Sequence, residues 1–133
     1  MKALVLYFSL TGNTKFISHI IRDAIGADEA RIPLQGEGVQ FENYDVIFIG
    51  TPVWAFGVPR PLQRFLEKTT ISQKRIAIFC SFSFIQGIVF SGLRGLLKGN
   101  TIVGQRAFRE PRRYKSKYQA AIAREWAQAI MAS

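Results

Sequence analysis

Tyr7-Phe8-Ser9-Leu10-Thr11-Gly12-Asn13-Thr14 is the stretch of the chain that decides its expected fold. It connects an apolar run, residues 2–8, to a segment in which apolar residues recur at helical spacing, residues 16–25. The apolar run is short and bounded by turn residues, as expected of a strand that is buried on both faces of a parallel sheet. The stretch is therefore predicted to be the loop between a first strand and a first helix.

The same alternation of strand and helix patterns continues through the chain. Further strands are expected at 29–32, 46–49, 75–80 and 101–105, the last with an alternative end at 108, and further helices at 61–68, 88–97 and 115–132. Such alternation indicates a parallel sheet with helices on both faces. We predict a single α/β domain over residues 1–133, with a doubly wound five-stranded sheet of order 2-1-3-4-5. Only residues 35–45 join the second and third strands, so the helix there should be reduced to a turn or absent.

Composition narrows the function classes. The 133 residues are 48% hydrophobic and 20% charged, and no apolar run reaches the ~18 residues of a membrane span. The first apolar run is too short for a signal peptide, so we expect a cytoplasmic protein without a membrane partner. One cysteine, Cys80, and one histidine, His19, exclude an intramolecular disulfide and a structural zinc site. We interpret Cys80 as a buried inert thiol and His19 as a solvated surface residue.

The loop at residues 9–14 combines features of an anion site. It precedes a helix N-terminus, where backbone N–H groups and the helix dipole favour negative charge, and Gly12 permits close approach. Its serine, threonines and asparagine add donors, although the same residue types also serve as ordinary helix caps. The loop matches neither G-x-x-x-x-G-K-[ST] nor G-x-G-x-x-G, which argues against a P-loop or a dinucleotide fingerprint.

Two aromatic loops should lie at the same edge of the sheet, because they follow the third and fourth strands. The first, residues 50–59, carries Trp54 between glycines and prolines, and the second, residues 81–87, carries Phe82 and Phe84. Aromatic side chains there could stack on a flat ring, or they could pack over a neighbouring helix.

These loops together resemble the flavodoxin family, whose phosphate loop reads [ST]-x-T-G-N-T after a first strand. Asp45-Val46-Ile47-Phe48-Ile49-Gly50-Thr51-Pro52-Val53-Trp54 is similar to that family's third strand and flavin loop. The resemblance implies FMN, with its phosphate held by loop 9–14, its ring against Trp54 and the edge of the ring flanked by loop 81–87. The implied cofactor-binding residues are Ser9, Leu10, Thr11, Gly12, Asn13, Thr14, Thr51, Pro52, Val53, Trp54, Ala55, Phe56, Ser81, Phe82 and Gly87.

Three functions remain open: an FMN-binding electron carrier, an NAD(P)H-dependent FMN reductase of quinones or similar acceptors, and a flavin-free interaction module. The net charge of +9 favours an anionic partner. A basic segment follows the fifth strand and should reach the flavin edge of the sheet, where it would dock an acidic redox protein or NAD(P)H. No aromatic-interleaved groove accompanies it, which argues against nucleic acid. Its basic residues are Arg106, Arg109, Arg112, Arg113, Lys115 and Lys117.

Overall fold

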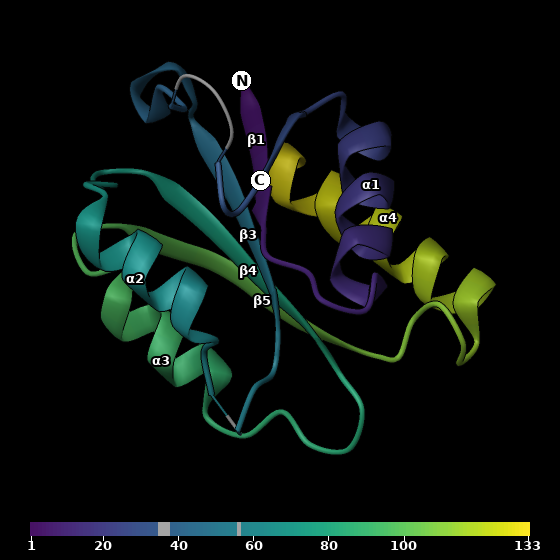
Figure 1. Ribbon diagram of the computed structural model, residues 1–133. Helices are drawn as coiled ribbons and strands as arrows, with labels where there is room; N and C mark the ends of the chain where they lie inside the picture. Colours follow the sequence, from purple (N-terminus) through teal and green to yellow (C-terminus); the bar gives the residue numbers. More distant parts are fainter. Residues whose placement is uncertain (35–37, 56) are drawn as a thin grey trace.

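The strands of the computed structural model form one parallel sheet of order β2-β1-β3-β4-β5 (Figure 1). This strand order confirms the predicted doubly wound sheet. The structure describes residues 1–34, 38–55 and 57–133. The strands are β1 (Ala3–Tyr7), β2 (Asp28–Arg31), β3 (Val46–Pro52), β4 (Arg75–Phe82) and β5 (Thr101–Arg109).

Helices cover both faces of the sheet, as the alternating pattern predicts. Figure 1 shows α1 and α4 on one face and α2 and α3 on the other. The helices are α1 (Asn13–Ile25), α2 (Arg60–Lys68), α3 (Val89–Leu96) and α4 (Ser116–Ala132). In the described part of the chain, no helix is long and apolar enough to cross a membrane.

Each strand of the sheet centre contributes side chains to two separate cores, because successive residues of a strand point to opposite faces. Leu4 and Leu6 of β1 join the core under α2 and α3. Val5 joins the core under α1 and α4, together with Phe48 and Phe79 from the neighbouring strands. Burial on both faces explains why these strands are continuously apolar in the sequence.

β3 and β4 are longer than the sequence pattern predicts. Gly50 was expected to end the third strand at residue 49, but β3 continues to Pro52 and β4 to Phe82. The reason is packing: a Cβ at Gly50 would lie 2.1 Å from Phe79 Cζ, so the glycine makes room for a core ring. Thr51, Pro52 and Ser81, expected in loops, therefore stand on strands.

The short link between β2 and β3 carries a single 3-10 turn, η1 (Phe41–Asn43), in its described part. Phe41 is buried, and its ring lies 6.2 Å from that of Phe65 on α2. The described part of the link, residues 38–45, thus holds a turn and no α-helix, as expected, while residues 35–37 lie outside the described residues.

Candidate functional site

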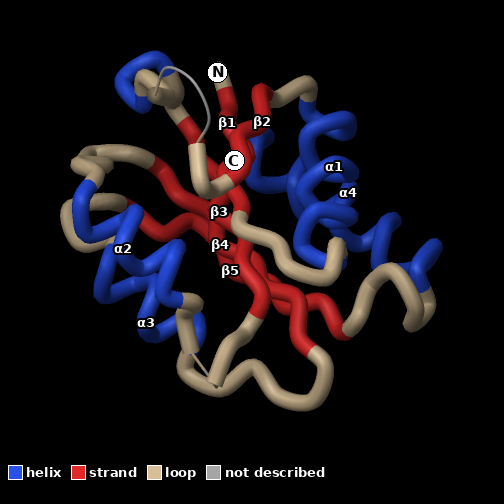
Figure 2. Tube along the Cα trace, in the orientation of Figure 1, coloured by secondary structure: helices blue, strands red, loops and turns tan. Residues whose placement is uncertain are grey.

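Four loops meet at the carboxyl edge of the sheet, where β1, β3, β4 and β5 end (Figure 2). Backbone hydrogen bonds hold them in register. The Val53 N–H donates to Ser81 O at 3.2 Å, and the Glu110 N–H donates to Phe82 O at 2.9 Å. Segments far apart in sequence therefore form one connected surface.

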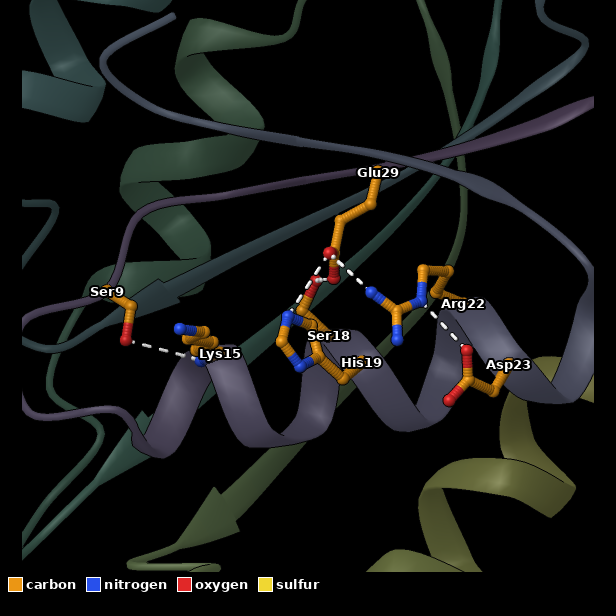
Figure 3. A network of polar contacts seen from close by, with 7 residues as sticks. All are labelled: Ser9, Lys15, Ser18, His19, Arg22, Asp23 and Glu29. Atoms are coloured by element: carbon orange, nitrogen blue, oxygen red, sulfur yellow. Dashed lines mark hydrogen bonds and ion pairs between the residues drawn. The ribbon is translucent and has the colours of Figure 1, made fainter.

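The loop at residues 9–14 presents backbone donors at the start of α1. Gly12 adopts a φ of 94°, and within the described residues the N–H groups of residues 10–14 have no hydrogen-bond partner. The Lys15 N–H donates to Ser9 Oγ at 3.2 Å (Figure 3). Helix capping therefore explains Ser9 but not the other polar side chains of the loop. The arrangement suits a group with several anionic oxygens.

Two buried hydroxyls lie directly behind this loop. Thr14 Oγ1 and Ser81 Oγ are 2.7 Å apart, although the residues are 67 positions apart in sequence. Thr14 is 1% exposed and Ser81 5% exposed. Because one hydroxyl donates to the other, the accepting hydroxyl keeps its own proton for a third group. The pair fixes the end of β4 against the N-terminus of α1.

Trp54 is held at the base of a tight turn after β3. The backbone N–H of Trp54 donates to Gly57 O at 3.0 Å, and the Gly57 N–H donates to Trp54 O at 2.7 Å. Trp54 is 42% exposed, and its ring meets that of Phe8 edge-on at a centroid distance of 5.9 Å. Trp54 thus packs against Phe8, just after β1, and it also lines a cavity together with residues of α2 and α3, so both predicted uses of its ring stay open.

A cavity of about 130 Å³ lies between the three loops that the sequence singles out. Most of the predicted site residues meet around it or behind it. Ser83, which was not among the predicted site residues, also lines it. The lining residues are Leu10, Thr11, Asn13, Pro52, Val53, Trp54, Ser81, Phe82 and Ser83.

The remaining predicted site residues stand elsewhere. Thr51 is buried, and its hydroxyl donates to Pro52 O at 2.8 Å. Ala55 lines a different cavity, and Gly87 is exposed and does not line the cavity between the loops. Phe56 lies outside the described residues. No contact in the structure assigns Thr51, Ala55 or Gly87 a ligand, and their roles stay predictions.

The cavity that Ala55 lines has a volume of about 640 Å³ and lies between α2 and α3. It is larger than the cavity between the loops and mainly apolar. It contains Trp54 but none of residues 9–14. Val58, Ile88 and Leu96 are among its apolar lining residues, and Arg60 also lines it. It extends the site away from the anion-binding loop and offers no comparable set of donors.

Arg106 and Arg109, which were expected after the fifth strand, lie on β5, because that strand continues to residue 109. Arg112, in the basic segment that follows β5, contacts the anion-binding loop. Arg112 Nη1 donates to Thr11 O at 2.7 Å, and the Arg112 N–H donates to Asn13 Oδ1 at 3.1 Å. The sequence singled out the charge of this segment but not the contact with the loop. No periodicity or motif encodes a pairing between residues about 100 positions apart.

Other titratable residues serve the fold. Glu29 of β2 accepts hydrogen bonds from Ser18 and Arg22, and its carboxylate lies 3.2 Å from His19 Nε2 (Figure 3). His19 is therefore half-buried and paired, not simply solvated as expected. Cys80 is fully buried, and burial raises the pKa of its thiol to about 12. The described residues hold no group of three potential metal ligands.

The sequence matches the family described as flavodoxin domain over residues 4–86. The chain belongs to this family. It is 42% identical over 83 residues to the flavodoxin-like domain-containing protein BilS of Clostridioides difficile, covering 59% of this chain and 46% of that one. An uncharacterized protein of Methanocaldococcus jannaschii is 33% identical over 110 residues, covering 79% of this chain and 73% of that one.

A third relative is named FMN-dependent NADH:quinone oxidoreductase 2, from Pseudomonas syringae, and is 34% identical over 70 residues. That match covers 50% of this chain and 27% of the relative, so the chain spans less than half of this protein and of BilS. A flavoprotein from Lactobacillus acidophilus, solved in complex with FMN, superposes with a TM-score of 0.70 at 20% identity, over 86% of this chain and 97% of that one. Oxidised Flavodoxin 2 from Bacillus cereus gives 0.75 at 21%, with 98% of both chains covered.

Proposed function

We propose that this flavodoxin-family chain binds FMN, with the phosphate in loop 9–14 and the ring beside Trp54. The observation that carries the proposal is a convergence of three features among the described residues: the N–H groups of residues 10–14, which have no hydrogen-bond partner there, the buried Thr14 and Ser81 hydroxyls behind them, and Trp54 at the cavity between the loops. FMN, when bound, supplies the electron-transfer chemistry. The protein's part is to hold the phosphate, orient the ring and limit access of water.

The donor chemistry of the loop fits a phosphate monoester. Backbone N–H groups supply fixed donors, and the helix dipole favours the negative charge. Ser9 and the Thr14–Ser81 pair add hydroxyl protons that rotate to suit an acceptor. The loop residues therefore bind the group without needing a metal ion.

The part of the site that would contact the flavin ring offers large apolar side chains. Leu10, Val53, Trp54 and Phe82 are the larger apolar side chains of the cavity wall. Trp54 beside this cavity is 42% exposed, so a ring placed against it would stay within reach of an external partner, which supports direct electron exchange.

We infer that the protein is an electron carrier for an anionic redox partner. The net charge of +9 and the exposed arginines at the carboxyl edge of the sheet favour such a partner. A carrier predicts that electron transfer slows as salt rises, since salt screens the attraction.

An NAD(P)H-dependent FMN reductase is the second candidate function. It is supported by the relative named as an FMN-dependent NADH:quinone oxidoreductase and by the cations beside the site, which would suit the phosphates of a nicotinamide cofactor. The carrier and the reductase are separated by measuring NADPH consumption by the FMN-loaded protein in the presence of a quinone acceptor. The carrier predicts no steady turnover without a second protein, and the reductase predicts saturable turnover.

A visible spectrum of the purified protein tests the proposal as a whole. We expect flavin absorbance in the protein as isolated, or after addition of FMN and removal of the excess. A colourless protein that retains no flavin after such loading would contradict FMN binding. The flavin-free interaction module would then be the remaining function of the three.

A further inference from the structure

Arg112 lies directly over the anion-binding loop. Its guanidinium Nη1 donates to Thr11 O at 2.7 Å, and its backbone N–H donates to Asn13 Oδ1 at 3.1 Å. A Cβ added at Gly12 would lie 2.6 Å from the same Nη1. The guanidinium therefore stands beside the N–H groups that begin α1.

The turn that presents Arg112 is held by several contacts. The Glu110 N–H donates to Phe82 O at 2.9 Å, and the Tyr114 N–H donates to Glu110 O at 2.8 Å. Gln119 Nε2 of α4 donates to Arg109 O at 2.7 Å, and Pro111 is buried. Arg112 thus projects from a braced turn that is attached to both β4 and α4.

The guanidinium keeps most of its hydrogen-bonding capacity. An arginine side chain carries five N–H donors, and within the described residues only one Arg112 side-chain bond, to Thr11 O, is made. The loop at residues 9–14 has no charged side chain of its own. Arg112 adds a positive charge to a site otherwise made of neutral donors.

Neighbouring Arg113 provides a natural contrast. Its guanidinium lies 3.7 Å from the Glu110 carboxylate, and its side chain is 84% exposed. Arg113 makes no side-chain hydrogen bond to residues 9–14 in the described structure. The two arginines have the same charge and adjacent positions, but only one contacts the loop.

We propose that Arg112 binds the terminal phosphate of the flavin and makes the site selective for FMN over riboflavin. The proposal rests on the proposed function. A phosphate monoester carries a charge of about −1.5 to −2 near neutral pH, and guanidinium forms strong, often bidentate hydrogen bonds to it. Riboflavin lacks this group, so Arg112 contributes to the binding of FMN alone.

The test compares FMN and riboflavin binding to flavin-free protein by fluorescence titration, for wild type, Arg112→Gln and the matched control Arg113→Gln. Arg112→Gln should weaken FMN binding about 10-fold, the low end for a hydrogen bond to a charged group, because the side chain is exposed. Riboflavin binding should stay within about twofold, and Arg113→Gln should match wild type for both ligands. Arg112→Lys, which keeps the charge, should recover part of the FMN affinity.

A second readout follows the phosphate itself. The 31P signal of bound FMN should titrate at lower pH in wild type than in Arg112→Gln, because a nearby cation stabilises the dianion.

Four results would overturn the proposal. The first two are equal FMN affinity in wild type and Arg112→Gln, and an equal loss in Arg113→Gln. The third is a parallel loss for FMN and riboflavin, which would show that Arg112 only positions Thr11. The fourth is identical 31P titrations. In these cases FMN binding by wild type would still support the proposed function, whereas a wild type that binds neither flavin would overturn both.

Discussion

The two sides of the site are built from different interactions. Residues 9–14 together with Ser81 and Arg112, which we call the phosphate side, are joined by directional hydrogen bonds, Thr14–Ser81 and Arg112–Thr11. The ring side, which consists of Val53, Trp54 and Phe82, is apolar, and Trp54 is 42% exposed. We infer that the phosphate side sets which ligand binds, and that the ring side sets how the ring is covered and approached.

Thr14→Ala should have the largest effect, because it acts on the phosphate side and on the fold together. Loss of a donor to a charged group should weaken FMN binding by about 1.5–3 kcal/mol. The buried Ser81 hydroxyl would also lose its partner, lowering the free energy of unfolding by about 1–3 kcal/mol. FMN titration and denaturant unfolding measure the two effects.

Ser81→Ala and the double variant complete a cycle. If the hydroxyl pair stabilises the fold, the double variant should be less destabilised than the sum of the single variants. Asn13→Ala, at a residue that is not fully buried, should weaken FMN binding with a smaller stability loss. Unchanged FMN affinity in both Thr14→Ala and Asn13→Ala would mean that loop 9–14 is only a helix start.

Gly12→Ala and Gly99→Ala separate backbone strain from site geometry. The φ angles of the two glycines are nearly equal, 94° and 91°, so alanine should cost each about 1–2 kcal/mol of stability. Only Gly12 lies in the phosphate side, and only its Cβ would crowd Arg112. FMN affinity should therefore fall in Gly12→Ala and stay at the wild-type value in Gly99→Ala. An equal fall in both would attribute the loss to general destabilisation.

Trp54→Ala tests the ring side. Removing the indole should weaken FMN binding by about 0.5–1.5 kcal/mol, independently of salt, and restore part of the quenched flavin emission. Phe84→Ala is the matched control, because Phe84 is exposed and does not line the cavity. Fluorescence of the fully loaded variants gives the answer, and unchanged emission in Trp54→Ala would place the ring elsewhere.

The smallest expected effect is that of the remaining arginines near the site. Replacing Arg109 and Arg113 with glutamine should lower the flavin reduction potential slightly, since each charge at ~10 Å contributes at most ~0.4 kcal/mol in water. Electron transfer to an anionic partner should slow at low salt and converge with wild type at high salt.

Lys68→Gln combined with Lys98→Gln is the control for this pair, because Lys68 ends α2 and Lys98 follows the end of α3, both away from the carboxyl edge. If the two double variants behave alike, net charge rather than the position of the arginines governs the rate.

The sequence was informative wherever a local pattern has one structural solution. Apolar runs bounded by turn residues predicted the sheet and its order, and Ser9 to Thr14 predicted the donor loop because helix starts bind anions by backbone geometry. The prediction that the third strand ends before Gly50 was wrong, because a glycine can either end a strand or make room for a ring. The packing of the Phe79 ring against Gly50 shows that the second applies here.

The parts of the site that depend on distant contacts could not be predicted. The Thr14–Ser81 pair and the placement of Arg112 on Thr11 join positions far apart in the chain. Hydroxyl and guanidinium groups have many possible partners, so their residue type alone does not name one. The basic run predicted charge at this edge of the sheet, and the fold determined which arginine meets the loop.

A fluorescence titration of FMN with flavin-free protein tests the central claim most directly. Flavin emission should fall as protein is added and reach a plateau at one protein per FMN, with weaker binding of riboflavin recorded in parallel. Emission that stays constant up to a large excess of correctly folded protein would contradict the claim that loop 9–14 and Trp54 form a flavin site.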